Sequence, residues 1–342
     1  MNITQKGIYT IAEMSANHAG KLENALAIVH AAKKSGADCL KIQTYTPDSM
    51  TINCDNEYFK IKGGLWDGYD LYQLYREAST PWDWQPKIKA ECDKAGIDFL
   101  STPFDPEAVD FLDSLGVDAF KIASFELVDI PLIRYTAKKG KPVIVSTGMG
   151  SLDEIEDAVN VMLEEGLTKE QITLLVCTSE YPADTSDMNL LTIADIQSRF
   201  RVRAGLSDHS VGILAPIAAV ALGATMIEKH FCLSRDIKTA DSDFSSEPAE
   251  FAEMVKAVRE AAAARGQVFY GATEREKNSV VFRRSIFAIK DIKAGEVFSQ
   301  ENVRIIRPGY GLKPKYYEKL MGRTSLRDYF RGEPITDCEL QL

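Results

Sequence analysis

Short runs of apolar, mostly β-branched residues alternate with longer segments of helical periodicity through the first three quarters of the chain. Glycine closes several of the helical segments just before the next apolar run, as in "SGADCLKIQ", "AGIDFLSTP", "LGVDAFKIA" and "LGATMIEKH". Eight runs are predicted to be strands: Tyr9–Met14, Cys39–Thr44, Asp98–Thr102, Ala119–Ala123, Val143–Thr147, Thr173–Thr178, Val202–Ser207 and Thr225–His230. Eight strand-helix units over about 260 residues predict an α/β fold of the (β/α)8 TIM-barrel type rather than an open sheet.

The helical segments carry their own start signals. Ser151 can cap a helix that runs to Gly166, and Glu154 completes a capping box. One face of that helix is predicted to be apolar through Leu152, Ile155, Val159 and Met162. The last barrel helix is predicted at Ala249–Arg265.

The final part of the chain has a different pattern. Alternating apolar residues and glycine turns, as in "RRSIFAIKDIKAGEVFSQENVRIIRPGYG", replace helical periodicity there. We therefore predict a barrel domain at 1–270, a polar linker at 271–283 and a small β-rich module at 284–342.

One predicted strand-helix connection is unusually long. About 37 residues separate the second strand from its helix, and the segment 46–81 with its flank contains Trp66, Tyr69, Tyr72, Tyr75 and Trp82. Such an insertion either contacts ligand at the barrel mouth or packs on itself, and the pattern leaves both interpretations open.

Composition narrows the class of protein. Hydrophobic residues make up 45% and charged residues 26% of the chain, which is ordinary for a globular protein. The net charge of -10 argues against general nucleic-acid binding. The six cysteines form no C-x-x-C pair, and no apolar run approaches the ~20 residues of a membrane span, so we expect reduced thiols, no membrane insertion and a cytoplasmic location.

Polar residues terminate the predicted strands, where barrel active sites lie. The strand ends supply Glu13, Lys41, Gln43, Thr102, Lys121, Ser124, Ser146, Thr178, Ser179, Ser207, Asp208, His209, Glu228 and His230. Polar side chains in apolar strands are costly without partners, so a functional ring is the preferred interpretation.

Two histidines end the last two predicted strands. His209 and His230 could share one divalent metal, or each could be a hydrogen-bonded histidine at the edge of the core. His18 and His30 have no ligand role that the pattern predicts.

Two lysines, Lys41 and Lys121, end otherwise apolar strands and indicate an anionic substrate, although a single lysine could instead reach to the rim. Hydroxyl groups from neighbouring strand ends would complete a phosphate or carboxylate site: Thr102, Ser124, Ser146 and Ser207. No "GxxxxGK[ST]", "HExxH" or "GxSxG" occurs, and the "GMG" at Gly148–Gly150 is too short for a dinucleotide fingerprint.

Ten segments in order resemble the sialic acid synthase family. They are "IAEMSANHAG", "GADCLKIQTY", "STPFD", "FKIAS", "VIVSTGM", "CTSEYP", "GLSDHS", "IEKHF", "RRSIFAIKDIKAGEVF" and "IRPGYG". The last two resemble the antifreeze-like (SAF) domain that these synthases carry. The resemblance implies a transferase that condenses phosphoenolpyruvate with an N-acetylated amino sugar.

The resemblance also implies residue roles. His209 and His230 would bind a divalent metal, usually Mn²⁺, with Mg²⁺ or Co²⁺ as alternatives. Phosphoenolpyruvate would be held by Lys41, Thr102, Lys121, Ser124, Ser146, Ser207 and Ser179, the last of which stands where many relatives have asparagine. The sugar or the attacking water would meet Glu13, Gln43, Tyr181, Glu228, Asp241 and Arg307. Arg307 would reach the barrel of a partner subunit in a domain-swapped homodimer.

Four segments resemble the pseudaminic branch of the family: "MSANH", "TYTPDSMT", "NEYFKIKGGLW" and "LYQLYREASTPW". This branch implies an acceptor of the 2,4-diacetamido-2,4,6-trideoxy-altrose type and a product used in bacterial surface glycans or flagellin. N-acetylneuraminate or legionaminate synthesis is the alternative. A Schiff-base aldolase using Lys41 or Lys121, or a degenerate barrel that serves only binding, is more remote.

Overall fold

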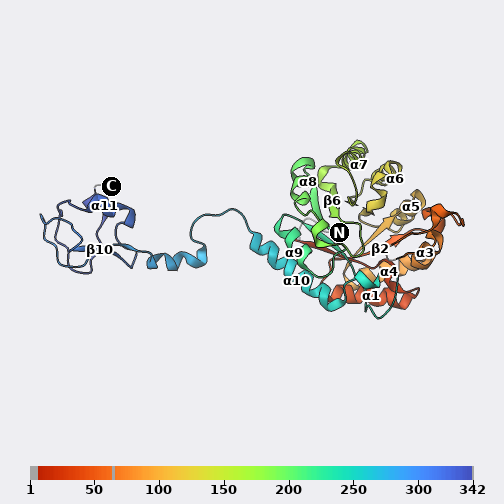
Figure 1. The fold of residues 1–342 in the computed structure, drawn as a ribbon, viewed down its shortest axis with the longest axis horizontal. Helices are drawn as coiled ribbons and strands as arrows, with labels where there is room; N and C mark the ends of the chain where they lie inside the picture. The colour runs from red at the N-terminus through yellow and green to blue at the C-terminus, as the bar shows by residue number, and fades with distance from the viewer. Residues whose placement is uncertain (1–6, 64–65, 341–342) are drawn as a thin grey trace. The chain divides into compact units, whose positions relative to one another are not determined.

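The computed structural model describes residues 7–63 and 66–340. The chain divides into two compact units, of which one ends at Gly266 and the other begins at Gln267 (Figure 1).

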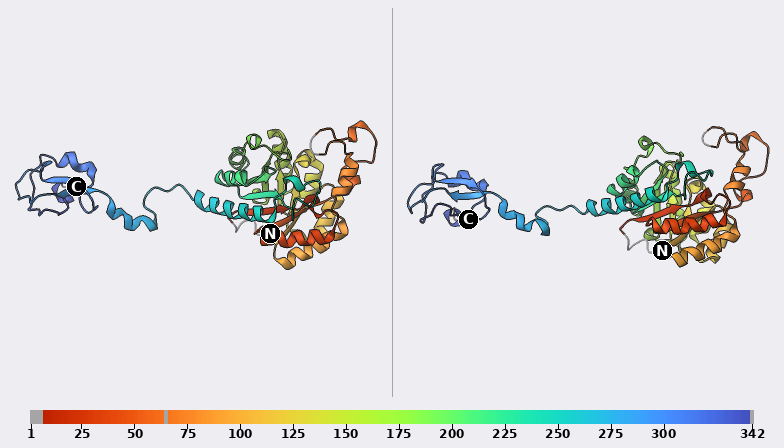
Figure 2. Two further views of the ribbon diagram at one scale, coloured as in Figure 1. Left: turned by 60° about the horizontal axis from the view of Figure 1, so that its bottom comes forward. Right: turned by 90° about the horizontal axis from the view of Figure 1, so that it is seen from below.

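The first unit is a (β/α)8 barrel. Parallel ladders join its strands in the order β3-β2-β1-β8-β7-β6-β5-β4, and β3 lies beside β4 to complete the ring (Figures 1 and 2). The strands are β1 Tyr9–Glu13, β2 Cys39–Thr44, β3 Asp98–Pro103, β4 Phe120–Ile122, β5 Val143–Ser146, β6 Ile172–Cys177, β7 Arg203–Asp208 and β8 Met226–His230. All eight predicted strands are confirmed, with bounds within one residue of those predicted.

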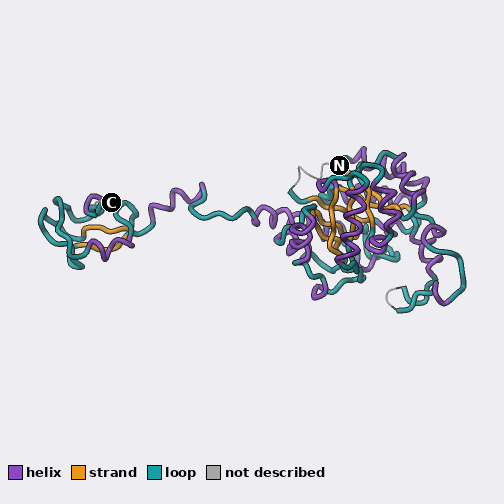
Figure 3. The backbone as a smooth tube through the Cα atoms, turned by 90° about the horizontal axis from the view of Figure 1, so that it is seen from above, coloured by secondary structure: helices purple, strands orange, loops and turns teal. Residues whose placement is uncertain are grey.

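Helices surround the strands, as the secondary-structure colours in Figure 3 show. They are α1 Leu22–Lys34, α4 Gln85–Ala95, α5 Pro106–Ser114, α6 Ile130–Ala137, α7 Leu152–Glu164, α8 Thr192–Phe200, α9 Leu214–Ala221 and α10 Pro248–Arg265. Ser151 and Glu154 form the predicted capping box. On the predicted apolar face of α7, Ile155, Val159 and Met162 are buried, whereas Leu152, the first residue of the helix, is 42% exposed.

Short 3-10 helices occupy several loops of both units. They are η1 Ser15–His18, η3 Trp82–Trp84, η4 Ser124–Val128, η5 Lys169–Gln171, η6 Thr185–Asp187, η7 Ser242–Phe244, η9 Pro314–Tyr316 and η10 Asp337–Glu339.

The barrel interior contains a layer of apolar side chains. It consists of Tyr9, Ile11, Cys39, Leu100, Ala119, Ile144, Leu175 and Met226. Side chains alternate between the two faces of a strand, so the next inward position towards each carboxyl end lies two residues later. Those positions are polar: Glu13, Lys41, Thr102, Lys121, Ser146, Cys177 and Glu228. The apolar layer therefore forms the floor beneath a polar mouth.

The insertion after β2 is ordered into α2 Pro47–Met50, η2 Glu57–Phe59 and α3 Leu71–Ala78. Some of its aromatic residues pack locally, since the rings of Tyr75 and Tyr45 lie 5.8 Å apart. Trp82 packs against Phe111, with ring centroids 4.8 Å apart. Trp66 and Tyr69 have another environment, described below.

The second unit has its own apolar core around Ile286, Phe298, Leu312 and Tyr329. Strands β9 Ser285–Ala288 and β10 Val303–Ile306 form an antiparallel pair, isolated bridges extend the pairing, and α11 spans Tyr317–Leu320. The segment that we predict as a linker contains the 3-10 helix η8 Glu274–Phe282. Across residues 7–63 and 66–340, no helix is both long and apolar enough to cross a membrane.

Candidate active site

Two lysines occupy the centre of the polar mouth. Lys41 and Lys121 are only 4% and 1% exposed, because β2 and β4 direct both side chains inwards above the apolar floor. The Lys41 ammonium lies 2.8 Å from Glu13 and 3.4 Å from Glu228, and it donates to Thr102 Oγ1 at 3.3 Å. Lys121 donates to Ser146 Oγ at 2.6 Å and lies 3.9 Å from Glu228. The predicted convergence of these residues is confirmed.

The two lysines differ electrostatically. Burial lowers the pKa of Lys121. Burial also opposes the charge on Lys41, but Glu13 and Glu228 outweigh that effect and raise its pKa. Lys41 is therefore the more firmly charged of the two.

The carboxylates also differ. Burial raises the pKa of Glu13, against the opposing influence of Lys41. Burial acts in the same direction on Glu228, but the neighbouring Lys121 and Lys41 outweigh it and lower its pKa. Ser207 Oγ donates to Glu228 at 3.4 Å. The mouth thus holds one firmly ionised carboxylate and one whose proton affinity is increased.

Ser124 and Ser179 meet over Gly148, to which the sequence pattern assigns no role in the site. The Gly148 amide donates to Ser124 Oγ at 3.1 Å. A Cβ at this position would lie 2.2 Å from Ser179 Oγ and 2.8 Å from Ser124 Oγ. Glycine is therefore required sterically for the two hydroxyl groups to converge. The signal was the "STGMG" segment after β5, which matches no phosphate-loop pattern.

The two histidines lie side by side at the mouth, His209 directly after β7 and His230 at the end of β8, with ring centroids 5.4 Å apart and ring planes tilted by 59°. His209 Nδ1 lies 3.0 Å from the Thr178 carbonyl oxygen, which assigns the proton to Nδ1 and leaves Nε2 as the acceptor atom. Burial lowers the pKa of His230 well below its usual value, and its buried Nδ1 has no hydrogen-bond partner. A neutral imidazole with a buried, unpartnered nitrogen has the chemistry of a metal ligand.

A divalent metal fits this pair as a two-histidine site. Within the described parts of the chain, no group of three or more His, Cys, Asp or Glu side chains is arranged to hold an ion. The histidines would therefore leave most coordination positions to substrate and water. Burial opposes protonation of His209, but the Cys177 thiol and the Thr178 carbonyl outweigh it and raise its pKa, so protons compete for this ring.

Gln43, Tyr181 and Asp241 line one side of the mouth. Gln43 Nε2 donates to Glu13 at 3.1 Å and to Ser15 Oγ at 3.0 Å. Asp241 accepts the Ala16 amide at 3.2 Å, and burial raises the pKa of this carboxyl group. The Tyr181 ring lies 4.3 Å from that of His209, which places the phenol beside the histidine pair.

Asp208 and Thr178 depart from the prediction that strand-end side chains enter the mouth. Asp208 ends β7 but points away from the mouth into a buried ion pair with Lys229 at 2.5 Å, because it lies on the opposite face from Ser207. Thr178 contacts His209 through its carbonyl oxygen rather than through its hydroxyl group. His18 is buried against Trp84, accepts the Gly20 amide at 3.0 Å, and has a pKa lowered by burial to about 4, so it is neutral.

Glu126 was not anticipated from sequence. It lies in η4, directly after the strand that carries Lys121, and burial raises its pKa to about 7. Its Oε2 atom is buried without a hydrogen-bond partner. A glutamate in the "FKIASFELV" segment gave no periodic signal, because it follows the strand end rather than terminating it. Arg307 is exposed in the second unit, so its site role stays a prediction.

Comparisons with known proteins identify the family of the chain. The NeuB family profile matches residues 28–270, and the SAF domain profile matches residues 283–341. The chain is 47% identical to a pseudaminic acid synthase of Campylobacter jejuni over 99% of this chain and 98% of that protein. It is 40% identical to a pseudaminic acid synthase of Helicobacter pylori over 97% of each chain.

Among solved structures, the N-acetylneuraminic acid synthetase of Leptospira borgpetersenii in complex with citrate superposes with a TM-score of 0.72 at 30% identity. That match covers 80% of this chain and 90% of the other. The family match spans more than half of the chain, and the two pseudaminic acid synthases match 99% and 97% of its length. The chain therefore belongs to the NeuB family and ends in a SAF domain.

Proposed function

We propose that this chain is a transferase that condenses phosphoenolpyruvate with 2,4-diacetamido-2,4,6-trideoxy-β-L-altropyranose and water, giving pseudaminic acid and phosphate. The observation that carries the proposal is the placement of two buried lysines and a set of hydroxyl groups beside a histidine pair. Identity of 47% along nearly the whole chain to a pseudaminic acid synthase supports the choice of sugar.

Phosphoenolpyruvate brings a phosphate and a carboxylate into the mouth. Lys41 and Lys121 would balance these charges, and the hydroxyl groups of Ser124, Ser146 and Ser179 would donate hydrogen bonds to the anionic oxygens. Binding the anion would also strengthen the charged form of Lys121, whose pKa burial lowers in the free protein. We call these two lysines and three serine hydroxyl groups the anion cradle. By fixing both anionic groups, the cradle orients the enol carbon towards the sugar.

His209 and His230 would hold a divalent metal, with Mn²⁺ preferred and Mg²⁺ or Co²⁺ as alternatives. When bound, such an ion supplies Lewis acidity that polarises the aldehyde oxygen of the open-chain sugar. Tyr181 would pack against the sugar beside the histidines, and Asp241 and Gln43 would bind its polar groups.

The remaining chemistry belongs to the carboxylates. C3 of phosphoenolpyruvate forms a bond to the aldehyde carbon with the electrons of the C2–C3 double bond, which leaves positive character at C2. The C=O π bond of the aldehyde breaks, and its oxygen takes up a proton and becomes a hydroxyl group. Glu228, kept ionised by the lysines, would stabilise the positive character at C2. Glu13, with its raised pKa, is suited to accept a proton from the water that adds to C2. Cleavage of the C2–O bond then releases inorganic phosphate and leaves the 2-keto acid.

One observation favours a second mechanism. A Schiff-base aldolase needs an uncharged lysine, and the lowered pKa of Lys121 meets that requirement. The raised pKa of Lys41 does not. Borohydride in the presence of a keto acid would trap Lys121 in an aldolase and would leave a condensing synthase active.

We further propose a cytoplasmic homodimer in which Arg307 of each SAF domain reaches the partner's barrel mouth. The exposed position of Arg307 on its own unit is consistent with such a contact. The product would serve surface-glycan or flagellin glycosylation.

The test is phosphate release from phosphoenolpyruvate with Mn²⁺ and three acceptors: the diacetamido altrose sugar, its D-mannose-configured analogue and N-acetylmannosamine. We expect turnover with the first and loss of turnover on adding EDTA, with recovery when Mn²⁺ is restored. Turnover with a different acceptor would assign the chain to the legionaminic or sialic branch. Activity that survives EDTA would refute the metal assignment.

A further inference from the structure

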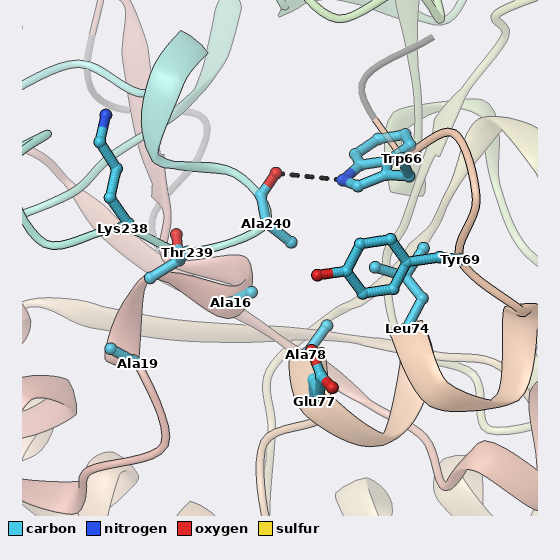
Figure 4. Close-up of a pocket in the computed structure, with 10 residues that line it drawn as sticks. All are labelled: Ala16, Ala19, Trp66, Tyr69, Leu74, Glu77, Ala78, Lys238, Thr239 and Ala240. Carbon is cyan, nitrogen blue, oxygen red and sulfur yellow. Dashed lines mark hydrogen bonds between the residues drawn. The ribbon is translucent and has the colours of Figure 1, made fainter. Parts of the chain in front are cut away.

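The insertion after β2 forms one wall of a pocket with a volume of about 410 Å³ (Figure 4). Trp66, Tyr69, Leu74 and Glu77 line this wall, and the loop at 238–240 after β8 lines the opposite one. The small side chains of the remaining lining residues leave room between the walls: Ala16, Ala19 and Ala78. The insertion is therefore more than a self-packed excursion.

Hydrogen bonds hold the aromatic wall in place. Trp66 Nε1 donates to the Ala240 carbonyl oxygen at 3.2 Å, which ties the insertion to the opposite wall (Figure 4). The Tyr69 amide donates to the Trp66 carbonyl at 3.1 Å. Asp70 caps α3 by accepting the Gln73 amide at 2.7 Å, and this helix presents Leu74 and Glu77 to the pocket. The lining is thus positioned before any ligand arrives.

Contacts connect the pocket to the sugar side of the reaction centre. The Trp66 ring lies 5.7 Å from the Tyr181 ring, which in turn lies 4.3 Å from His209. The backbone amide of Ala16, a lining residue, donates to Asp241. Tyr181 and Asp241 are the residues to which the proposed function assigns the sugar. A sugar held between them would extend its non-reacting end towards the pocket.

The lining has the chemistry of an acylamino site. Leu74, the alanines and the Trp66 indole provide apolar surface for a methyl group. The Tyr69 hydroxyl points across the pocket towards the loop at 238–240 and can donate to an amide carbonyl (Figure 4). Glu77 uses Oε1 to accept from Gln73 at 2.9 Å, so its other oxygen can accept from an amide N–H.

Charge argues against an anionic occupant. Among the described residues that line the pocket, Lys238 is the one cation, and its ammonium group is paired with Asp243 at 2.8 Å. In Figure 4 its side chain points away from Tyr69 and Glu77. The carboxylate of Glu77 would repel a phosphate or carboxylate at this point.

We propose that this pocket binds the acetamido group at C4 of the acceptor sugar, and that Tyr69 and Glu77 thereby determine which amino sugar is used. The inference rests on the proposed function and specifies its acceptor site. A sugar with a hydroxyl group at C4 would lack the amide that hydrogen-bonds to Tyr69 and Glu77, so its kcat/KM should be lower than that of the diacetamido sugar.

The experiment compares two acceptors, the 2,4-diacetamido sugar and an analogue with a hydroxyl group at C4, in the wild type and in Tyr69→Phe and Glu77→Gln. The matched control is Tyr58→Phe, because Tyr58 belongs to the same insertion, is 88% exposed and does not line the pocket. We expect kcat/KM for the diacetamido sugar to fall on the order of ten- to a hundredfold in each pocket variant. The kcat/KM for the analogue, the KM for phosphoenolpyruvate and the control variant should be unchanged.

The outcomes separate the two proposals. If the wild type releases phosphate with neither of the two acceptors, both the proposed function and this inference are refuted. An active wild type that does not discriminate between the two acceptors overturns this inference alone. So does an equal loss of kcat/KM with both acceptors, or no loss with either, in the pocket variants.

Discussion

Replacing Gly148 with alanine tests the anion cradle with a single methyl group. The backbone at Gly148 is not in the left-handed region, so alanine can adopt the same conformation without strain. The new Cβ would lie 2.2 Å from Ser179 Oγ and 2.8 Å from Ser124 Oγ, and 3.1 Å from Ser124 Cβ. Both hydroxyl groups must therefore move away from the point at which they converge.

The size of the effect follows from these distances. Non-bonded carbon and oxygen atoms need about 3.5 Å, so the Ser179 hydroxyl must move by about 1 Å, which is enough to break a hydrogen bond. A hydrogen bond to a charged group contributes about 1.5–3 kcal/mol, and about 1.4 kcal/mol corresponds to a factor of ten. Losing one such bond to phosphoenolpyruvate should raise its KM about ten- to a hundredfold.

The assay is phosphate release as a function of phosphoenolpyruvate concentration at saturating acceptor, together with thermal unfolding. Gly7→Ala is the matched control, because a Cβ at Gly7 meets no atom within 4 Å. We expect Gly148→Ala to raise KM for phosphoenolpyruvate with little change in KM for the sugar, and Gly7→Ala to behave as the wild type. A KM for phosphoenolpyruvate within twofold of the wild-type value would refute the cradle.

Three further predictions concern stability and the second unit. Burial raises the pKa of Glu126 from 4.5 to about 7, so the native state binds the extra proton and loses stability as the pH rises through this window. Glu126→Gln should remove that loss of stability, about 3 kcal/mol, so the denaturation midpoint of the variant should exceed that of the wild type at pH 8 but not at pH 4. A difference in midpoint between variant and wild type that is the same at both pH values would contradict the burial argument. Asp208→Asn should lower the free energy of unfolding by about 3–5 kcal/mol, because Lys229 is left as an unpaired buried charge, and an unchanged urea midpoint would contradict this. Arg307→Ala should abolish phosphate release without changing the melting temperature. The control Arg304→Ala, at another exposed arginine, should retain phosphate release, and full activity of Arg307→Ala would refute the partner-subunit role.

Much of the site followed from local pattern. Lys41 and Lys121 interrupt apolar strands, and their strands could be recognised because a glycine-closed helix precedes each one. Since parallel strands of a barrel end on one face, polar strand ends must converge there. The convergence of both lysines with Glu13 and Glu228 is therefore a consequence of strand order and side-chain alternation, which the sequence carries.

Other parts of the site required tertiary structure. Gly148 and Glu126 lie in loops beyond the strand ends, where no periodicity relates a residue to the mouth. The pocket between Trp66 and the loop at 238–240 joins segments that are far apart in the chain, so no local sequence pattern predicts it.

Ser207 and Asp208 show most clearly what the sequence determines and what only the tertiary structure decides. Both are polar residues at the end of one predicted strand, and the sequence by itself determined that one of them faces inwards and the other outwards. Which is which depends on the closed ring: Ser207 pairs in register with Glu228 and enters the mouth, while Asp208 is buried outside the barrel against Lys229. Strand periodicity is a local property of the chain, whereas the direction in which a strand faces is decided only when its neighbours are in place.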